Sequence, residues 1–92
     1  MTFRQLNCFA AIYECRSIVR AAQKLYISQQ GLSRILGTLE GEAGVLFVRL
    51  HHGLEPTPLG TKLYYACQPV LREMHQLDRV IADVSQLAAK QL

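Results

Sequence analysis

Hydrophobic residues recur at helical spacing along residues 29–43, while the opposite positions are polar or very small. The apolar residues, three or four positions apart, are Leu32, Ile35, Leu36 and Leu39. This period predicts an amphipathic α-helix, and Ser28 is well suited to be its N-cap. At about 100° per residue, the residues of the opposite face are Gln30, Ser33, Arg34 and Gly37.

The polar face has the side chains that read base pairs in the major groove of DNA. Glutamine pairs bidentately with adenine, arginine pairs with guanine, and serine can reach either base. A solvated surface helix is the simpler explanation of this segment taken alone. The DNA hypothesis therefore depends on what the rest of the chain provides.

Two shorter helices are predicted before this segment. Thr2 opens a capping box, and apolar residues continue at helical spacing to about Cys15. Ser17 can cap a second helix over residues 18–25, whose adjacent alanines allow a neighbouring helix to approach closely. With a brief turn at residues 26–27, this helix and the next form a helix-turn-helix arrangement, although the turn lacks the glycine often found there.

A short β-hairpin is predicted after the amphipathic helix. Gly44 fits the left-handed C′ position at the end of that helix. Residues 45–49 are rich in strand-forming side chains, and residues 54–55 can pair with them across a tight turn at residues 50–53. Such a two-stranded wing is marginally stable unless it packs on helices.

A long helix is predicted from the N-cap Thr57, with Pro58 at its first position. Hydrophobic residues follow an alternating spacing of four and three for more than three heptads, at Leu63, Cys67, Val70, Met74, Leu77, Ile81, Val84 and Ala88. This seam favours a dimerisation helix over a helix that packs only along its own domain. Because Pro69 removes a backbone hydrogen bond, a bend is predicted near residues 65–69.

Basic residues are concentrated in the part of the chain that contains the predicted helix-turn-helix. Residues 1–39 hold five arginines and lysines against one glutamate, a net charge of +4, whereas residues 40–60 carry −2. Such a skew suits a polyanionic partner. The 92-residue chain has a net charge of +3 and room for only a modest core, so oligomerisation is expected to add stability.

Cysteine usage and hydropathy predict a cytoplasmic protein. The three cysteines are odd in number and lack Cys-x-x-Cys spacing, which indicates free thiols in a reducing compartment. No apolar run approaches the length of a membrane span, and no secretory signal is visible. We expect no membrane partner.

No catalytic or metal-binding constellation is evident. His51 and His52 are adjacent, and no third metal ligand is suitably spaced from them. No cysteine has the context of a nucleophile, and no carboxylate pair indicates acid–base chemistry. We therefore predict no enzymatic activity, no metal and no cofactor. A rival hypothesis is a protein-interaction module, in which the same helices and heptad seam dock another protein.

Three stretches of the chain resemble the N-terminal DNA-binding domain of bacterial LysR-type transcriptional regulators. They are residues 3–9, which begin F-R-Q-L, residues 21–34 and residues 44–60. The second stretch reads A-A-x-x-L-x-x-S-Q-x-x-L-S-R and is the most specific. The resemblance covers roughly residues 1–65, and it implies a winged helix-turn-helix followed by a linker helix that pairs two subunits.

The resemblance also implies roles for particular side chains. Gln29, Ser33 and Arg34 occupy positions from which the family's recognition helix, here about residues 29–43, meets DNA, and Arg49 resembles the wing arginine. With the polar face and the flanking basic residues included, the expected DNA-binding residues are Arg20, Ser28, Gln29, Gln30, Ser33, Arg34, Thr38, Arg49, His51 and His52.

Three positions depart from the family's pattern. Gln30 replaces a common proline and adds a side chain that can read a base. His52 stands where the family often has arginine, which weakens that wing contact near neutral pH. Pro56 replaces the usual leucine, so the second wing strand is expected to be short.

The expected fold is mainly α, with a winged helix-turn-helix and small two-stranded wing over residues 1–57 and a long C-terminal dimerisation helix over residues 58–92. The residues expected between two subunits are Leu63, Cys67, Val70, Met74, Leu77, Ile81 and Val84. We expect a homodimer that binds double-stranded DNA at an inverted repeat in the nucleoid and regulates transcription. Any small-molecule effector would act only through the family's C-terminal effector domain, which this sequence does not contain.

Overall fold

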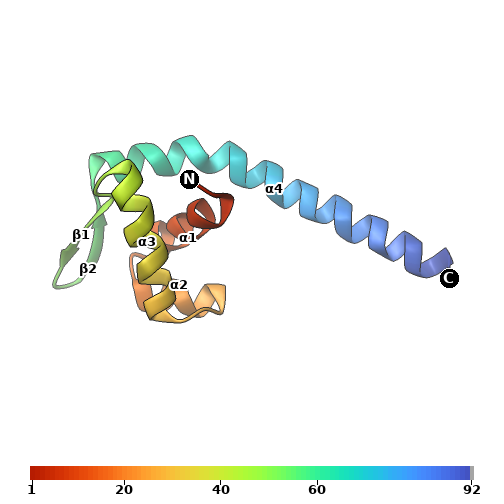
Figure 1. The fold of residues 1–92 in the computed structure, drawn as a ribbon, viewed down its shortest axis with the longest axis horizontal. Helices are drawn as coiled ribbons and strands as arrows, with labels where there is room; N and C mark the ends of the chain where they lie inside the picture. Colours follow the sequence, from red (N-terminus) through yellow and green to blue (C-terminus); the bar gives the residue numbers. More distant parts are fainter. Residues whose placement is uncertain (92) are drawn as a thin grey trace.

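The computed structural model describes the backbone of residues 1–91 and the side chains of residues 1–87. In chain order its elements are α1 (Phe3–Cys15), α2 (Ile18–Leu25), α3 (Gln29–Ala43), β1 (Phe47–Leu50), β2 (Gly53–Pro56) and α4 (Pro58–Gln91). The first three helices and the hairpin form a globular unit, and α4 crosses this unit and projects beyond it (Figure 1). The principal extents of 54 × 25 × 20 Å reflect this projection.

Side-chain caps begin the first three helices at the residues that the sequence predicts. The Gln5 amide donates to Thr2 Oγ1 at 3.1 Å, and the Thr2 amide donates to Gln5 Oε1 at 2.8 Å, which completes a capping box. Ser17 and Ser28 accept hydrogen bonds from amides at the third helical position of α2 and α3. Each cap satisfies an amide that the helix itself leaves unpaired. The helices begin directly after these caps, which confirms the predicted N-terminal ends.

The turn between α2 and α3 is made without glycine. Tyr26 adopts the left-handed conformation, with φ of 58°, and its amide donates to the carbonyls of Ala22 and Gln23. This backbone conformation costs a non-glycine residue about 1–2 kcal/mol. The helix-turn-helix geometry is therefore retained at the expense of strain at one exposed tyrosine.

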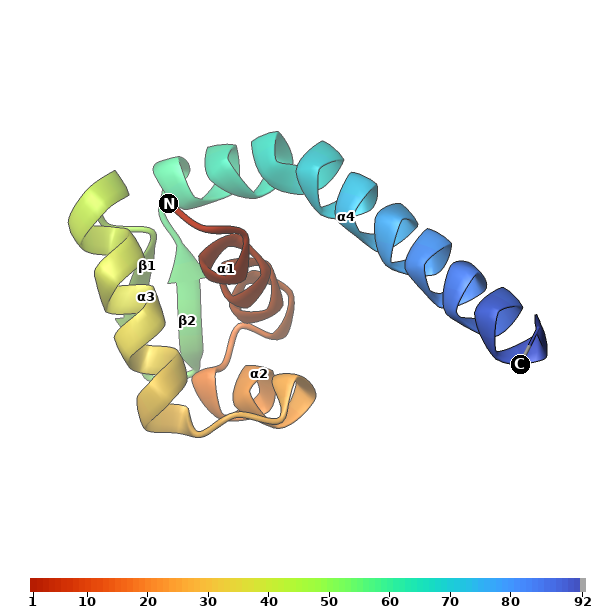
Figure 2. The same ribbon diagram turned by 45° about the vertical axis from the view of Figure 1, so that its right-hand side comes forward.

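The hydrophobic core surrounds α1. This helix contacts α2, α3 and α4, and Figure 2 shows it in the middle of these three helices. The largest fully buried side chains are Phe9, Ile12, Leu32, Leu39 and Leu46. Their burial confirms that the apolar stripe of α3 faces the core.

The wing is a two-stranded antiparallel hairpin in which Leu50 pairs with Gly53 across a two-residue turn. The predicted start of the first strand at residue 45 is wrong, because Val45 and Leu46 direct their carbonyls to the Thr57 hydroxyl and amide instead of to the partner strand. The predicted four-residue turn is likewise shorter in the structure. Pro56 ends the second strand, which has only four residues, as short as the first.

Contacts at the start of β1 attach the wing to α3. The Glu40 carboxylate accepts hydrogen bonds from the amides of Leu46 and Phe47, at 2.7 and 3.3 Å. Gly44, the C-cap of α3, has φ of 110° and ψ of 176°. The left-handed helical conformation predicted for it is therefore wrong, since the chain leaves α3 with an extended ψ that leads directly toward β1.

The N-terminal half of α4 is part of the core. Thr57 Oγ1 accepts from the Gly60 amide at 3.0 Å, as expected for an N-cap. Cys67 and Leu71 are buried, and Leu63 is half-buried against the globular unit. Cys67 therefore packs within the chain, whereas Leu63 keeps part of its surface exposed, and its predicted place between subunits stays a prediction.

The C-terminal half of α4 leaves the globular unit. Figure 2 shows that α4 changes direction in its teal to light-blue part, and Pro69 lies inside the helix. The predicted bend near residues 65–69 agrees with this change of direction, since a proline removes a helical hydrogen bond and crowds the preceding turn.

Tyr64 attaches α4 to α1. Its ring stacks on that of Tyr13 with the centroids 3.9 Å apart and the planes 7° from parallel. Its hydroxyl donates to Glu14 Oε2 at 2.7 Å. The carboxylate acceptor and partial burial raise the pKa of the Tyr64 phenol to about 12.

This pKa predicts an alkaline transition. Because the folded-state pKa is raised above the ordinary value of 10.0, the contribution of Tyr64 to stability is complete below pH 10 and is lost as the pH rises through about 12. In ultraviolet titration of the four tyrosines, Tyr64 is expected to ionise in a late phase near pH 12. The late phase should be absent in Tyr64→Phe, and its persistence in that variant would contradict the assignment.

Gly60 is required by the contact between α4 and the chain before β1. A Cβ atom at this position would overlap the backbone carbonyl of Leu46. We expect Gly60→Ala to lower the free energy of unfolding by about 2–3 kcal/mol, because the overlap is with backbone that cannot rotate away. Chemical denaturation measures the change.

Gly41→Ala is the matched control for this substitution. Its Cβ meets nothing within 4 Å, and alanine has the higher helix propensity by about 1 kcal/mol. Gly41→Ala should therefore leave stability unchanged or raise it. If Gly60→Ala were as stable as the unsubstituted chain, the Leu46 backbone would be able to shift without loss of folding free energy, and the prediction would be wrong.

Candidate nucleic-acid interface

The outer face of α3 is polar and low in bulk. Leu32 and Leu39 are buried, whereas the side chains of Gln29, Gln30, Ser33, Arg34 and Thr38 are exposed. The glycines on this face, Gly37 and Gly41, leave open space above the helix. The backbone of α3 can therefore approach a surface closely while longer side chains at its N-terminal half reach ahead of it.

The Thr38 hydroxyl is already engaged within the helix. It donates to the carbonyl of Arg34 at 3.0 Å. This leaves its oxygen available as an acceptor and its methyl group exposed, so Thr38 is suited to an apolar or accepting contact rather than to donating.

A groove of about 240 Å³ runs between α3 and the wing. Ser33 and Gly37 line it from α3, and Arg49 lines it from β1. Ile18 lines it from the start of α2. The groove thus places one hydroxyl and one guanidinium from different elements beside the same space.

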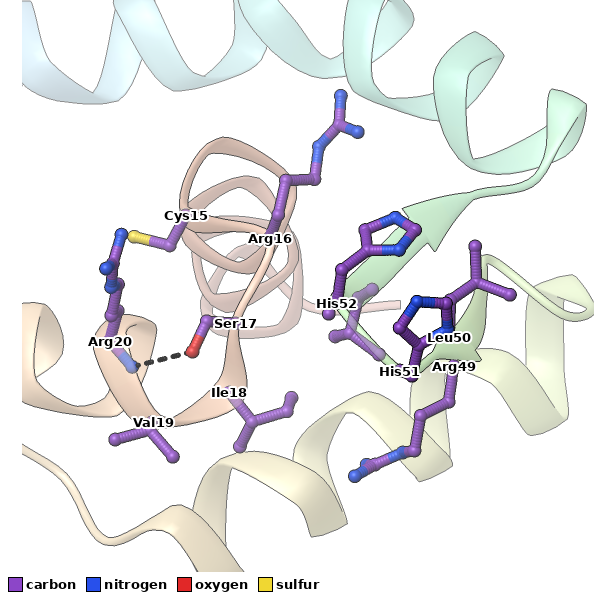
Figure 3. A pocket seen from close by; sticks show the side chains of 12 residues that line it. Cys15, Arg16, Ser17, Ile18, Val19, Arg20, Arg49, Leu50, His51 and His52 are labelled. Atoms are coloured by element: carbon purple, nitrogen blue, oxygen red, sulfur yellow. Dashed lines mark hydrogen bonds between the residues drawn. The ribbon is translucent and has the colours of Figure 1, made fainter.

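A larger cleft of about 610 Å³ lies between the start of α2 and the wing (Figure 3). Five of its lining residues carry basic side chains, and none of its lining residues is acidic. The basic residues are Arg16, Arg20, Arg49, His51 and His52. It shares Ile18, Arg49 and Leu54 with the groove, so the two spaces adjoin.

Glu55 partly offsets the charge at one side of this cleft. Its carboxylate lies 3.5 Å from Arg16 Nη1 and 3.4 Å from His52 Nε2. Among the side chains of residues 1–87, Arg20, Arg34 and Arg49 take part in no ion pair. The three arginines are therefore available to an anionic partner without first leaving a carboxylate.

The predicted DNA-binding residues are all exposed, but the structure does not gather them into one cluster. Arg20, Arg49, His51 and His52 meet at the cleft, and Ser33 joins Arg49 at the groove. Ser28, with its cap to Gly31, and the residues of the outer face of α3 lie beside these spaces without lining them. The residues placed there are Gln29, Gln30, Arg34 and Thr38.

Sequence reasoning missed three residues of this region. Arg16 and Ser17 line the cleft, and Glu40 lines the groove while it holds the start of the wing. Arg16 and Ser17 interrupt the hydrophobic period, which indicates a connection between helices and nothing about the wing. Glu40 follows an apolar stripe and has no local signal at all.

The cysteines and histidines form no metal-binding group in the part of the chain whose side chains are described. Cys8 and Cys67 are buried free thiols, and burial raises the pKa of each, with Arg4 opposing the effect at Cys8. Cys15 is half-buried at the edge of the cleft. None of the described helices is long and apolar enough to cross a membrane.

Beyond the bend, α4 exposes a strip of large apolar side chains. Val70, Leu77, Ile81 and Val84 are each about half exposed, and Met74 is half-buried. Val80 and Leu87 widen the strip. A contiguous apolar surface of this kind on a helix without neighbours is typical of a protein–protein contact.

The three-helix core, the turn between α2 and α3 and the hairpin after α3 define a winged helix-turn-helix protein. The family described as "Bacterial regulatory helix-turn-helix protein, lysR family" matches residues 3–61. The chain therefore belongs to the LysR family.

Individual relatives extend the similarity over the whole chain. The chain is 36% identical over 93 residues to the nitrogen assimilation regulatory protein nac of Escherichia coli (strain K12), covering 100% of this chain and 30% of that protein. It therefore spans about a third of this relative's length. The relatives are transcriptional regulators.

Several solved structures share the fold, among them two DNA complexes. The crystal structure of the BenM_DBD/benA site 1 DNA complex has a TM-score of 0.78 and 33% identity, covering 91% of this chain and 99% of that chain. Full-length CbnR complexed with its target DNA has a TM-score of 0.77 and 34% identity, covering 89% of this chain and 29% of that chain.

Proposed function

We propose that the chain binds double-stranded DNA sequence-specifically as a homodimer on an inverted repeat and thereby regulates transcription. The observation that carries this proposal is the position of a thin polar helix face beside a groove that Arg49 lines and an adjoining cleft with five basic residues. Four of the similar solved structures are DNA complexes. The chain would act by binding, without catalysis or a cofactor, in the bacterial cytoplasm where the chromosome lies.

The cleft suits the phosphate backbone. Arg20 and Arg49 face it from α2 and β1, and the wing histidines lie at its edge. Contacts of basic side chains with phosphates position a protein on the duplex and make its affinity dependent on salt. The groove between wing and α3 then brings the phosphate-binding residues next to the base-reading ones.

The outer face of α3 suits the major groove. Gln29, Gln30, Ser33 and Arg34 carry the donors and acceptors that distinguish base pairs, and each good bidentate contact contributes about 1–3 kcal/mol of discrimination. Residues 1–57 would supply this recognition, and residues 58–92 the pairing of subunits. Within that second part, pairing would rest on the strip beyond the bend, with Val70, Leu77, Ile81 and Val84 as its centre.

Fluorescence anisotropy on an inverted-repeat duplex and a scrambled duplex, across a salt series, tests the proposal. Tighter binding to the repeat, with the logarithm of affinity falling linearly with the logarithm of salt, is the expected result. Absence of binding at low salt would instead favour a protein-interaction module that uses the same helices. A small-molecule effector would act through a C-terminal effector domain of the family's type and not through residues 1–92.

A further inference from the structure

The strip proposed to pair the subunits is separated from the helix proposed to read DNA. Among residues 1–87 the last buried residue of α4 is Leu71, and the exposed strip runs from Val70 to Leu87. The pairing surface therefore touches neither α3 nor the cleft within one chain. The junction between the N-terminal half of α4 and the globular unit therefore sets the relative positions of the two recognition helices in a dimer.

The geometry makes this junction sensitive to small rotations. The part of α4 after Leu71 has about 20 residues, or roughly 30 Å at 1.5 Å per residue. A rotation of about 10° at the junction moves the far end of such a helix by roughly 5 Å. This displacement exceeds the 3.4 Å rise of one base pair, so the junction angle bears directly on half-site spacing.

One end of the junction is held by backbone. Gly60 packs on the Leu46 carbonyl, and Thr57 bonds to Val45 and caps α4. These contacts lie within the first turn of the helix and form a pivot. A second attachment further along α4 is needed to set its direction.

Tyr64 provides the polar part of that second attachment. Its ring stacks on Tyr13, and its hydroxyl donates to Glu14. The other carboxylate oxygen of Glu14 lies 3.3 Å from Lys24 Nζ at the C-terminal end of α2. A continuous set of contacts therefore runs from α4 through α1 to the first helix of the helix-turn-helix.

A second branch leads to the cleft. The Arg16 guanidinium carbon lies 4.7 Å above the Tyr13 ring, and Arg16 Nε donates to the Tyr13 carbonyl at 2.7 Å. Tyr13 thus lies in contact with Tyr64 of α4 and with a basic residue of the cleft. Both branches place Tyr64 between the dimer strip and the DNA-facing elements.

We propose that Tyr64, held by Tyr13 and Glu14, is a positioning residue that sets the angle of α4 to the helix-turn-helix and so determines which half-site spacing the dimer accepts. The apolar contacts of Cys67 and Leu71 keep α4 on α1 but have little directional preference. The stack of Tyr64 on Tyr13 and its hydrogen bond to Glu14 both require a defined orientation, so they fix the direction of α4. This inference rests on the proposed dimeric DNA binding.

The test compares affinities for inverted repeats whose half-sites are moved apart or together by one and by two base pairs. Unsubstituted protein is expected to favour one spacing. Tyr64→Leu, which lacks both the parallel stack and the hydroxyl, should reduce the preference for that spacing by at least ~5-fold, about 1 kcal/mol. Tyr64→Phe, which keeps the ring, should give a smaller loss, and Tyr65→Phe is the matched control at an exposed neighbour.

Two further readouts separate this role from a merely structural one. Dimer mass in sedimentation and affinity for a single half-site should be the same for all variants. An unchanged spacing preference in both Tyr64 variants would overturn the inference, as would an equal loss of affinity at every spacing. If the unsubstituted protein does not distinguish the repeats from scrambled DNA, the proposed function itself fails, and this result is distinct from the other two.

Discussion

Leu77→Asp is expected to convert the homodimer into a monomer. Leu77 is about half exposed at the centre of the strip on α4, between Val70 and Val84. In a dimer the carboxylate would be buried without a partner, a change that costs several kcal/mol. We expect the dissociation constant of the dimer to rise by at least ~100-fold, about 3 kcal/mol, as measured by sedimentation equilibrium.

Gln86→Asp is the matched control for this substitution. Gln86 is exposed, nine positions from Leu77, and roughly half a turn around the helix from it. The same carboxylate is thus introduced on the face away from the strip. A dimer that survives Leu77→Asp, or one that Gln86→Asp disrupts equally, would show that the subunits pair through another surface.

Arg34→Ala is expected to reduce sequence preference without removing DNA binding. Arg34 lies on the exposed face of α3 and forms no ion pair within residues 1–87, so its guanidinium is free to pair with a guanine. Loss of a bidentate contact should lower discrimination between the repeat and scrambled duplex by about 1–3 kcal/mol, or roughly 5- to 150-fold. Anisotropy on both duplexes at one salt concentration measures the ratio.

The control for Arg34→Ala removes the same charge elsewhere. Arg79 is exposed on α4, nearly opposite the apolar strip. Arg79→Ala should leave the ratio of the two affinities unchanged. An equal loss on both duplexes in Arg34→Ala would mean that Arg34 contacts phosphate, and the base-reading role would then pass to the glutamines beside it.

The local features of the fold were predictable because their causes lie within a few residues. Thr2, Ser17 and Ser28 begin helices through bonds to amides three positions away. The apolar stripe of α3 follows from a period that needs no knowledge of the partner surface. The wing was predictable as a hairpin but not in its bounds, since Val45 and Leu46 are held by Thr57 from the following helix.

The candidate site likewise has a part that the sequence predicts and a part that it does not. The exposure of Gln30, Ser33 and Arg34 follows from the helical period, whereas the cleft needs the start of α2 and the wing to meet in space. The residues 20 and 49 that line it are far apart in the chain. Spacing patterns relate residues only a few positions apart, so they cannot predict that residues 20 and 49 lie close together in space.

The sequence by itself therefore determined where helices begin, which side of each is apolar and which segment carries the positive charge. Only the tertiary structure decided which residues of the heptad seam pack within the chain and which stay exposed: Cys67 is buried in the core, and Leu77 is half exposed. It also decided that Tyr64 meets Glu14, 50 positions away. The physical reason is that capping and periodicity act between near neighbours, whereas burial and charge pairing depend on which distant surfaces the chain brings together.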